Sequence, residues 1–306
     1  MKTKHAILFA AALLAMPAIA VAAAATQDTA APAAPARAEA TPPERVVFRS
    51  LDDAHTELVG YLYSPVGVQG AAPAVVLMHG RAGAYSSLAN GVYDAATLSM
   101  RHRYWARYWA ERGYYALVVD GFGPRGYPGG FARGSYDERP DAVNEVTVRP
   151  LDAYGALRYL RTLPGVDDDR IGLMGWSNGG SATLATMADD KPGDMRRLGF
   201  RAGLAMYPAC GLHNRFARTG YSTYAPVRVF MGTEDEEVSH DRCRDLIGAS
   251  RARGHAVAFT SYRGATHSFD DPGTRRQSVP ANARATADVR IEAALFFEEA
   301  LAPRQP

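Results

Sequence analysis

The 306-residue chain has little net charge and no stretch dominated by charge of one sign. Its 34 Lys and Arg residues nearly balance 32 Asp and Glu residues, which gives a formal net charge of +2. There is no basic run, no acidic tail and no aromatic motif typical of RNA binding, so we expect no nucleic-acid partner. No internal repeat is present either, which argues against a repeat architecture.

Cysteine is scarce, with Cys210 and Cys243 as the two examples. Neither belongs to a CxxC pair or lies at a histidine spacing typical of zinc, so we expect no metal and no other cofactor. Two free buried thiols are one alternative. An export signal would place the pair in an oxidising compartment, where we predict a disulfide between them.

The N-terminal segment has the features of an export signal. Two lysines precede an apolar stretch, residues 6–15, that is too short to span a bilayer comfortably, and A-x-A cleavage sites follow. We expect residues 1–24 to be a signal peptide and the mature protein to be periplasmic or secreted, without stable membrane insertion. An uncleaved membrane anchor is the alternative. Residues 25–43 are expected to be a disordered Ala/Pro-rich linker before a folded domain at 44–303.

The folded region alternates apolar runs with helical patterns, which is typical of a mostly parallel sheet covered by helices on both faces. This order predicts an eight-stranded α/β-hydrolase fold whose first two strands are antiparallel. A long loop at 121–150 is expected to overhang the site and to shape the substrate pocket. We expect strands at 45–50, 58–63, 74–78, 115–120, 170–176, 202–207, 227–231 and 256–262. We expect helices at 98–112, 151–163, 177–188, 239–253 and 281–301.

The most informative motif is Gly-Trp-Ser-Asn-Gly-Gly at 175–180, directly after an apolar run. It matches the G-x-S-x-G pattern of a nucleophile elbow, a sharp turn between a buried strand and a helix. Glycines flank the serine because a side chain there would clash with the tight turn. The motif therefore predicts that Ser177 is a nucleophile.

The α/β-hydrolase order requires an acid and then a histidine after the serine, each on a loop at the carboxyl end of a strand. The loop after 227–231 offers Asp235, favoured because a short carboxylate after a glycine turn is easily held rigid. His267 follows the last strand and would take the proton of Ser177, while Asp235 would hold the imidazole in the correct tautomer. The competing acids are Glu234, Glu236 and Glu237.

Backbone donors and substrate contacts follow from the same arrangement. We expect an oxyanion hole from the backbone N–H groups of Asn178 and Arg81, with Ala82 as the alternative to Arg81. Arg81, Arg125 and Trp176 are expected to contact the substrate. For both arginines, salt bridges that hold loops are an equally open alternative.

Taken together, these segments resemble the dienelactone hydrolase family of the α/β-hydrolases. The resemblance implies Ser177, Asp235 and His267 as a catalytic triad, with Arg81 and Asn178 as oxyanion donors. One departure is the nucleophile, because the namesake of the family uses a cysteine where this chain has Ser177. The matching segments are 78–81, 120–126, 152–154, 170–180, 232–235 and 264–270.

The sequence therefore predicts an exported serine hydrolase that cleaves small carboxylic esters or lactones through an acyl-enzyme. A serine peptidase of the prolyl-oligopeptidase type shares the elbow and the order of the triad. Against it, only the expected linker precedes residue 44, where that type carries a propeller domain. A non-catalytic binding protein on the same fold is the third hypothesis.

Overall fold

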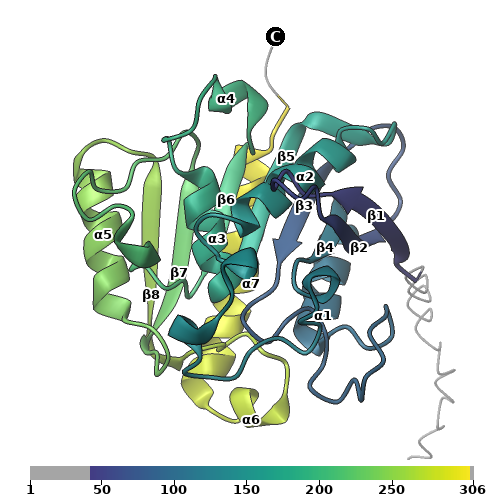
Figure 1. The fold of residues 1–306 in the computed structure, drawn as a ribbon. Coiled ribbons are helices and arrows are strands. Elements are labelled where there is room, and N and C mark those ends of the chain that lie inside the picture. Colours follow the sequence, from purple (N-terminus) through teal and green to yellow (C-terminus); the bar gives the residue numbers. More distant parts are fainter. Residues whose placement is uncertain (1–41, 304–306) are drawn as a thin grey trace, which may run out of the picture. The chain divides into compact units, whose positions relative to one another are not determined.

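An eight-stranded sheet forms the centre of residues 42–303, the part of the chain that the computed structural model describes (Figure 1). The predicted signal peptide, and all but the end of the predicted linker, lie outside the described residues. The strands are β1 (Glu44–Arg49), β2 (Glu57–Tyr63), β3 (Ala72–Met78), β4 (Tyr115–Asp120), β5 (Val166–Trp176), β6 (Ala202–Met206), β7 (Val227–Glu234) and β8 (Val257–Thr266). Their order across the sheet is β1-β2-β4-β3-β5-β6-β7-β8. Strands β1, β2 and β4 pair antiparallel and all later pairs are parallel, so the predicted α/β-hydrolase architecture is confirmed.

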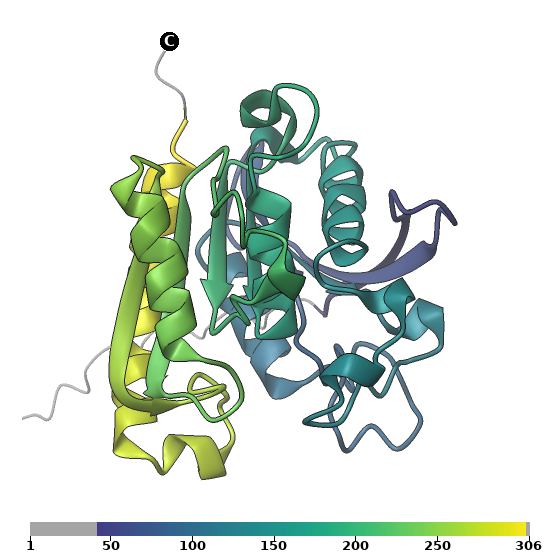
Figure 2. The same cartoon turned by 60° about the vertical axis from the view of Figure 1, so that its left-hand side comes forward.

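Helices cover both faces of this sheet (Figures 1 and 2). Helices α2 (Arg149–Leu160), α3 (Asn178–Met187) and α5 (His240–Ala252) lie on one face, whereas α1 (Met100–Ala110) and α7 (Pro280–Ala300) lie on the other. A side chain at Gly203 would meet Met187 of α3, and one at Gly172 would meet Phe297 of α7, which separates the two layers. Two short helices, α4 (Met195–Leu198) and α6 (Thr274–Gln277), complete the set in the described residues.

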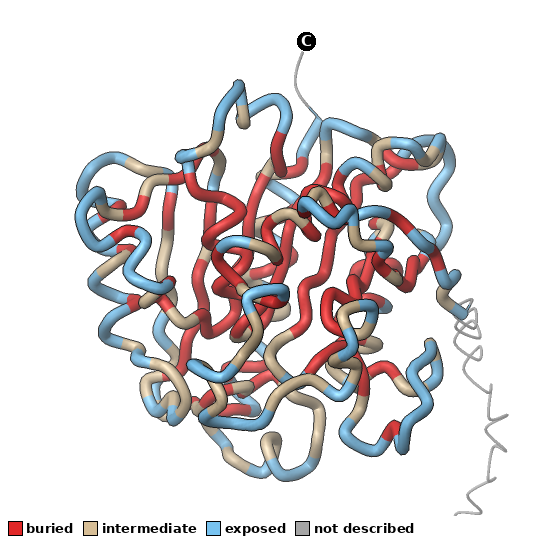
Figure 3. Tube along the Cα trace, viewed as in Figure 1, coloured by how far each residue is buried: buried red, intermediate tan, exposed pale blue. Residues whose placement is uncertain are grey.

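The central strands are buried along almost their whole length, as Figure 3 shows. Every residue of β3 is buried, because helices cover both faces of the parallel part of the sheet. Between α1 and α7, the rings of Trp109 and Phe297 pack with centroids 5.2 Å apart. No helix among residues 42–303 combines the length and the apolar character needed to cross a membrane.

The carboxyl ends of β3, β5, β7 and β8 meet at one edge of the sheet, since these strands run parallel. The loops that follow them therefore lie close together. The long loop between β4 and α2 reaches the same region and contains three 3-10 turns, at Gly123–Arg125, Tyr136–Glu138 and Asp141–Val143.

Some element ends differ from the predicted ones. Helix α2 begins at Arg149 rather than 151, because Pro150 fits the first turn, where no backbone N–H is required. The two four-residue helices, α4 and α6, were not predicted. Such short helices carry too few residues to show a periodic apolar pattern.

Candidate active site

Ser177 lies in the sharp turn between β5 and α3. Its φ of 53° and ψ of −114° are strained for a residue with a side chain. A Cβ on Gly175 would lie 2.1 Å from the carbonyl oxygen of Gly179, and a Cβ on Gly179 would lie 2.1 Å from that of Met78. Both positions therefore need glycine, and the turn lies directly against the end of β3.

The structure brings His267 and Asp235 to this serine. His267 Nε2 lies 3.0 Å from Ser177 Oγ, and His267 Nδ1 lies 2.8 Å from Asp235 Oδ2. The backbone N–H groups of Glu237 and Val238 donate to Asp235 Oδ1 at 3.0 and 2.9 Å and fix the carboxylate. The side chains of His267 and Asp235 are 3% and 0% exposed. A hydroxyl that faces the cavities, a buried imidazole and a buried carboxylate thus form a hydrogen-bonded chain along which a proton can leave Ser177.

The other acids of this loop do not hydrogen-bond the His267 ring. Glu236 instead accepts the backbone N–H of His267 at 2.8 Å and pairs with Arg276. Burial alone would raise the pKa of Glu236, but these partners hold it below its ordinary value. Glu234 is exposed, and Glu237 pairs with an arginine from another loop.

Free backbone donors lie beside the serine. A Cβ on Gly80 would lie 3.5 Å from Ser177 Cβ, so the loop after β3 packs against the turn. Within residues 42–303, the backbone N–H groups of Arg81, Ala82 and Asn178 donate to no protein acceptor. Asn178 is also the first residue of α3, whose N-terminus carries partial positive charge. These groups can donate to a negatively charged oxygen. Arg81 and its predicted alternative Ala82 both remain available as the donor that acts together with Asn178.

A buried polar network holds the Asn178 side chain from behind. Asn178 Oδ1 accepts from Arg149 Nη1 at 2.5 Å, and Asn178 Nδ2 donates to Glu145 Oε2 at 2.9 Å. Arg149 Nη1 also donates to the His79 carbonyl at 2.8 Å, while His213 Nε2 lies 3.3 Å from Glu145 Oε1. Burial lowers the pKa of Arg149 to about 10, so its charge persists at neutral pH. The network therefore joins the long loop, the end of β3 and the turn at Ser177.

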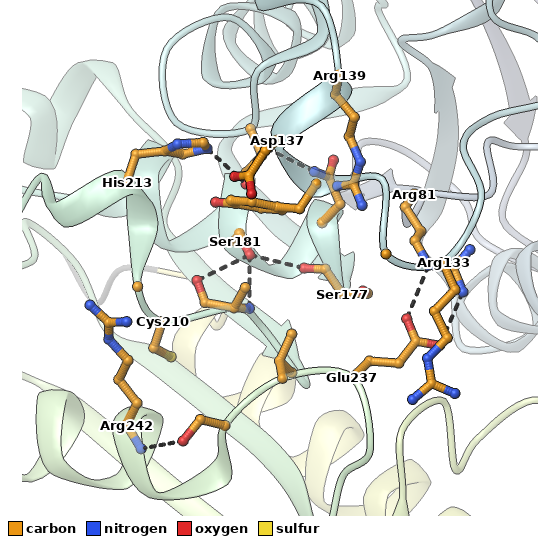
Figure 4. Close-up of a pocket in the computed structure, with 18 of the residues that line it drawn as sticks. Arg81, Arg133, Asp137, Arg139, Ser177, Ser181, Cys210, His213, Glu237 and Arg242 are labelled. Atoms are coloured by element: carbon orange, nitrogen blue, oxygen red, sulfur yellow. Dashed lines mark hydrogen bonds and ion pairs between the residues drawn. The ribbon is translucent and has the colours of Figure 1, made fainter.

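Two cavities open at Ser177. The first, about 550 Å³, lies between the long loop, the loop after β6 and the start of α5 (Figure 4). The second, about 940 Å³, lies between the loop after β3, the start of α1 and the segment after β8. In the first cavity, Arg139, His213 and Arg242 line the wall. The residues shared by both cavities are Arg81, Arg133, Ser177, Glu236 and Glu237.

Two predicted substrate contacts are corrected by the structure, since Arg125 and Trp176 line neither cavity. The Arg125 side chain is 6% exposed and pairs with Asp52 at 2.5 Å and Asp152 at 2.8 Å. This matches the alternative that it holds loops together. Trp176 is fully buried, and its Nε1 donates to Asp270 Oδ2 at 2.9 Å.

Asp270 and Glu145 are site-supporting residues that sequence reasoning missed. Asp270 accepts from Trp105 Nε1 at 2.8 Å, from Trp176 Nε1 at 2.9 Å and from Tyr207 Oη at 2.5 Å. It connects the residue before Ser177 to a tyrosine whose ring packs on His267. Its position at the end of segment 264–270, which carries part of the family resemblance, is the sequence feature that could have identified it. Glu145 lies in the long loop, where no local pattern marks it.

Cys210 and Cys243 form the predicted disulfide, which joins the loop after β6 to α5. Cys210 lines the first cavity, so the disulfide is part of its wall. Among the residues that the structure describes, no group of three or more His, Cys, Asp or Glu side chains is arranged to hold a metal ion.

Solved structures with the same fold are similar to this chain. Esterase 2 of Thermogutta terrifontis, phosphorylated by paraoxon, is 22% identical with a TM-score of 0.59, and the match covers 87% of this chain and 98% of that one. A putative dienelactone hydrolase from Klebsiella pneumoniae subsp. pneumoniae MGH 78578 is 17% identical with a TM-score of 0.59, covering 83% and 98%. The propionate-bound form of the Thermogutta esterase is 20% identical with a TM-score of 0.56, covering 88% and 98%.

A search among curated protein sequences returns no match. The model of the dienelactone hydrolase family matches residues 58–301, from β2 to the end of α7, which is far more than half of the chain. This region includes Ser177, Asp235, His267 and both cavities. The chain therefore belongs to the dienelactone hydrolase family and is a hydrolase with the α/β-hydrolase fold.

Proposed function

We propose that this protein is an exported serine hydrolase that cleaves carboxylic esters of small molecules, with Ser177, His267 and Asp235 as its catalytic triad. The observation that carries the proposal is the row of hydrogen bonds from Ser177 Oγ to His267 Nε2 at 3.0 Å and from His267 Nδ1 to Asp235 Oδ2 at 2.8 Å. A serine hydroxyl is a weak nucleophile at neutral pH, and this row supplies the base that it needs.

In the acylation step, Ser177 Oγ attacks the ester carbonyl carbon while its proton passes to His267 Nε2. The carbonyl oxygen becomes an oxyanion, which accepts hydrogen bonds from the free N–H groups of Asn178 and Arg81. Asp235 stabilises the imidazolium and keeps the ring oriented. Collapse of the tetrahedral intermediate breaks the bond to the alcohol, which takes the proton from His267 Nε2 and leaves an acyl-enzyme.

In the deacylation step, water replaces the departed alcohol. His267 Nε2 takes a proton from the water as its oxygen attacks the acyl carbon, and a second oxyanion forms in the same place. The carboxylic acid leaves when the proton returns to Ser177 Oγ. The two cavities that meet at Ser177 give room for the acyl part and the alcohol part of the ester.

Two similar structures support the esterase assignment. The Thermogutta esterase is phosphorylated by paraoxon in one structure and has propionate bound in another. Attack on an activated phosphoryl group and binding of a short carboxylate both fit an enzyme that forms and hydrolyses acyl-serine.

Export rests on the basic and apolar pattern of residues 1–24 and on the disulfide, which is typical of oxidising compartments. Fractionation of the producing cell tests it. We expect the chain in the periplasmic or extracellular fraction and shortened at its N-terminus. A full-length cytosolic chain would contradict export and leave the chemistry unaffected.

Covalent labelling tests the nucleophile. A fluorophosphonate probe should label the wild type, and Ser177→Ala should abolish labelling and lower kcat for a p-nitrophenyl ester by about 10⁴-fold or more. Ser135→Ala is the matched control, because its hydroxyl lies on the long loop and bonds only the Ala132 carbonyl. Folded wild-type protein that resists the probe would contradict the proposal.

A substrate comparison separates the remaining hypotheses. A peptidase hydrolyses peptide anilides as well as activated p-nitrophenyl esters, whereas an esterase hydrolyses the esters and leaves the anilides intact. A binding protein gives no turnover on a panel of esters with graded acyl lengths, yet it holds one of them tightly.

A further inference from the structure

An ion pair connects two loops of the site beside the proposed triad. Arg81, in the loop after β3, donates from Nε and Nη2 to the two carboxylate oxygens of Glu237, each at 3.0 Å. Glu237 lies in the loop after β7, two residues after Asp235. The side chains are 22% and 13% exposed, so the pair is largely buried, and it borders both cavities. Figure 4 shows the pair beside the first cavity. A two-pronged geometry of this kind fixes orientation as well as charge.

Arg81 is also held on its other side. Its Nη1 donates to the Phe131 carbonyl at 3.0 Å, and its own carbonyl accepts the Phe131 N–H at 2.8 Å. The side chain and the carbonyl of Arg81 are thus both fixed, by two different loops, while its backbone N–H has no protein acceptor among the described residues. This is the arrangement needed to hold one N–H group aimed at an oxygen that becomes charged during the reaction.

Glu237 reaches the base as well. Its Oε2 lies 3.8 Å from His267 Nε2, and its backbone N–H donates to Asp235 Oδ1 at 3.0 Å. Burial alone would raise the pKa of Glu237, but the hydrogen bonds and charges of its partners hold it below the ordinary value. Glu237 is therefore a carboxylate next to the nitrogen that becomes charged when His267 accepts the proton.

We propose that Glu237 and the Arg81 side chain are positioning residues for the reaction. The pair aligns the Arg81 backbone N–H with the developing oxyanion, and Glu237 adds negative charge beside the imidazolium. This inference rests on the proposed function, because it assigns both residues a part in the same acyl transfer. The alternative is a salt bridge that only stabilises the loops at the cavity edge, which would affect stability and leave kcat unchanged.

The two roles of the pair give different signatures. The bound ester carries no oxyanion, and the negative charge develops as the transition state forms, so poorer alignment lowers kcat with little change in KM. Glu237→Gln removes the anion beside His267 and leaves the Arg81 cation, so the acid limb of the kcat/KM profile moves to lower pH. Arg81→Met leaves the carboxylate unpaired, so that limb moves to higher pH.

Other groups around the imidazole stay the same in these variants. Burial raises the pKa of Tyr207, which therefore remains neutral across the range of the assay. The remaining charges keep their partners, since Glu236 pairs with Arg276 and Arg101 pairs with Asp271. The titratable or charged groups around His267 are Asp235, Glu236 and Glu237 after β7, Tyr207 after β6, Arg101 on α1, Arg276 on α6, and Arg81 and Arg133 at the cavity rim.

The experiment measures kcat, KM and the acid limb for the mature protein with a short p-nitrophenyl ester. For Arg81→Met and Glu237→Gln we expect kcat about 10-fold or more below the wild type, with KM within about twofold. We expect the acid limbs to move by roughly 0.5–1 pH unit in opposite directions. Arg81→Lys keeps the charge and loses the fork, so it should lower kcat with an acid limb close to that of the wild type.

Glu234→Gln is the matched control, because this exposed acid lies in the same loop. It should behave as the wild type does. Thermal melting of every variant accompanies the kinetics, and Arg81→Lys stands in if Arg81→Met does not fold. An active, probe-labelled wild type whose variants keep its kcat and its acid limb would overturn the positioning role alone. A folded wild type with neither turnover nor labelling would overturn the proposed function and this inference together.

Discussion

Asp270 is a buried carboxylate that accepts hydrogen bonds from several side chains around the site. Its replacement by asparagine tests directly how the fold around Ser177 is stabilised. It is 1% exposed and accepts hydrogen bonds from Trp105, Trp176 and Tyr207, with Arg101 Nε 3.5 Å away. In Asp270→Asn, the amide oxygen can still accept both indole N–H groups, and the amide N–H can donate to the tyrosine hydroxyl. The change therefore removes the charge, takes away the acceptor of the Tyr207 O–H group and leaves Arg101 Nε without its nearest carboxylate oxygen.

The cost follows from the difference between charged and neutral acceptors. A hydrogen bond to a carboxylate contributes roughly 1.5–3 kcal/mol, and one to a neutral amide about 1 kcal/mol. Across the three bonds, we expect the free energy of unfolding to fall by about 2–4 kcal/mol. For a domain of this size, that corresponds to a decrease in Tm of about 5–12 °C.

Thermal and urea unfolding measure this change, and tryptophan fluorescence reports it, because two of the three tryptophans bond to Asp270. Asp241→Asn is the matched control, since this carboxylate is exposed on α5 and pairs only with neighbouring surface side chains. We expect the control to melt with the wild type. An Asp270→Asn variant that melts within a degree of the wild type would refute the assignment of Asp270 as a stabilising centre.

Three further changes test other parts of the structure. Arg125→Met leaves two buried carboxylates without their partner, so it should destabilise the protein by about 3–5 kcal/mol in urea unfolding. KM for a short ester should stay near the wild-type value. A large rise in KM would show that Arg125 contacts the substrate after all. Cys210→Ser with Cys243→Ser opens a covalent loop with a sequence separation of 33, which should cost about 3–4 kcal/mol of stability. An unchanged melting temperature would contradict this loss of stability. The double variant should also raise KM for esters that fill the first cavity. Burial alone would raise the pKa of Asp52, but hydrogen bonds from Thr56 and Arg125 hold it below the ordinary 3.8. Its contribution to stability is therefore present above about pH 4 and is lost as the pH falls through the lower folded value. Asp52→Asn should flatten that acid decline, and an equally steep decline would refute the assignment.

The positions of Ser177 and His267 could be predicted because short-range and chain-order rules determine them. The glycines around Ser177 are required by the local turn, which any copy of the motif between a strand and a helix must make. His267 and Asp235 follow parallel strands, so the direction of the sheet places both at one edge. Neither prediction needed knowledge of a side-chain partner.

The partners of Arg125 and Trp176 could not be predicted, because they lie far away in the chain. Arg125 meets Asp52 at a sequence separation of 73, and Trp176 meets Asp270 at one of 94. A cation or an indole near a candidate nucleophile looks the same in the sequence whether it faces substrate or a buried carboxylate. The pairing of Arg81 with Glu237, at a separation of 156, was hidden in the same way.

The two cavities that meet at Ser177 Oγ have different walls, so selectivity for the two halves of an ester can be set separately. Apart from the residues that both share, the first cavity is lined by the loop after β6 and the start of α5, and the second by the start of α1 and the segment after β8. Substitutions in either wall can therefore change the preference for one half of an ester and leave the preference for the other half intact. Evolution or design could then adjust acid and alcohol choice one at a time, without moving the atoms that perform the reaction.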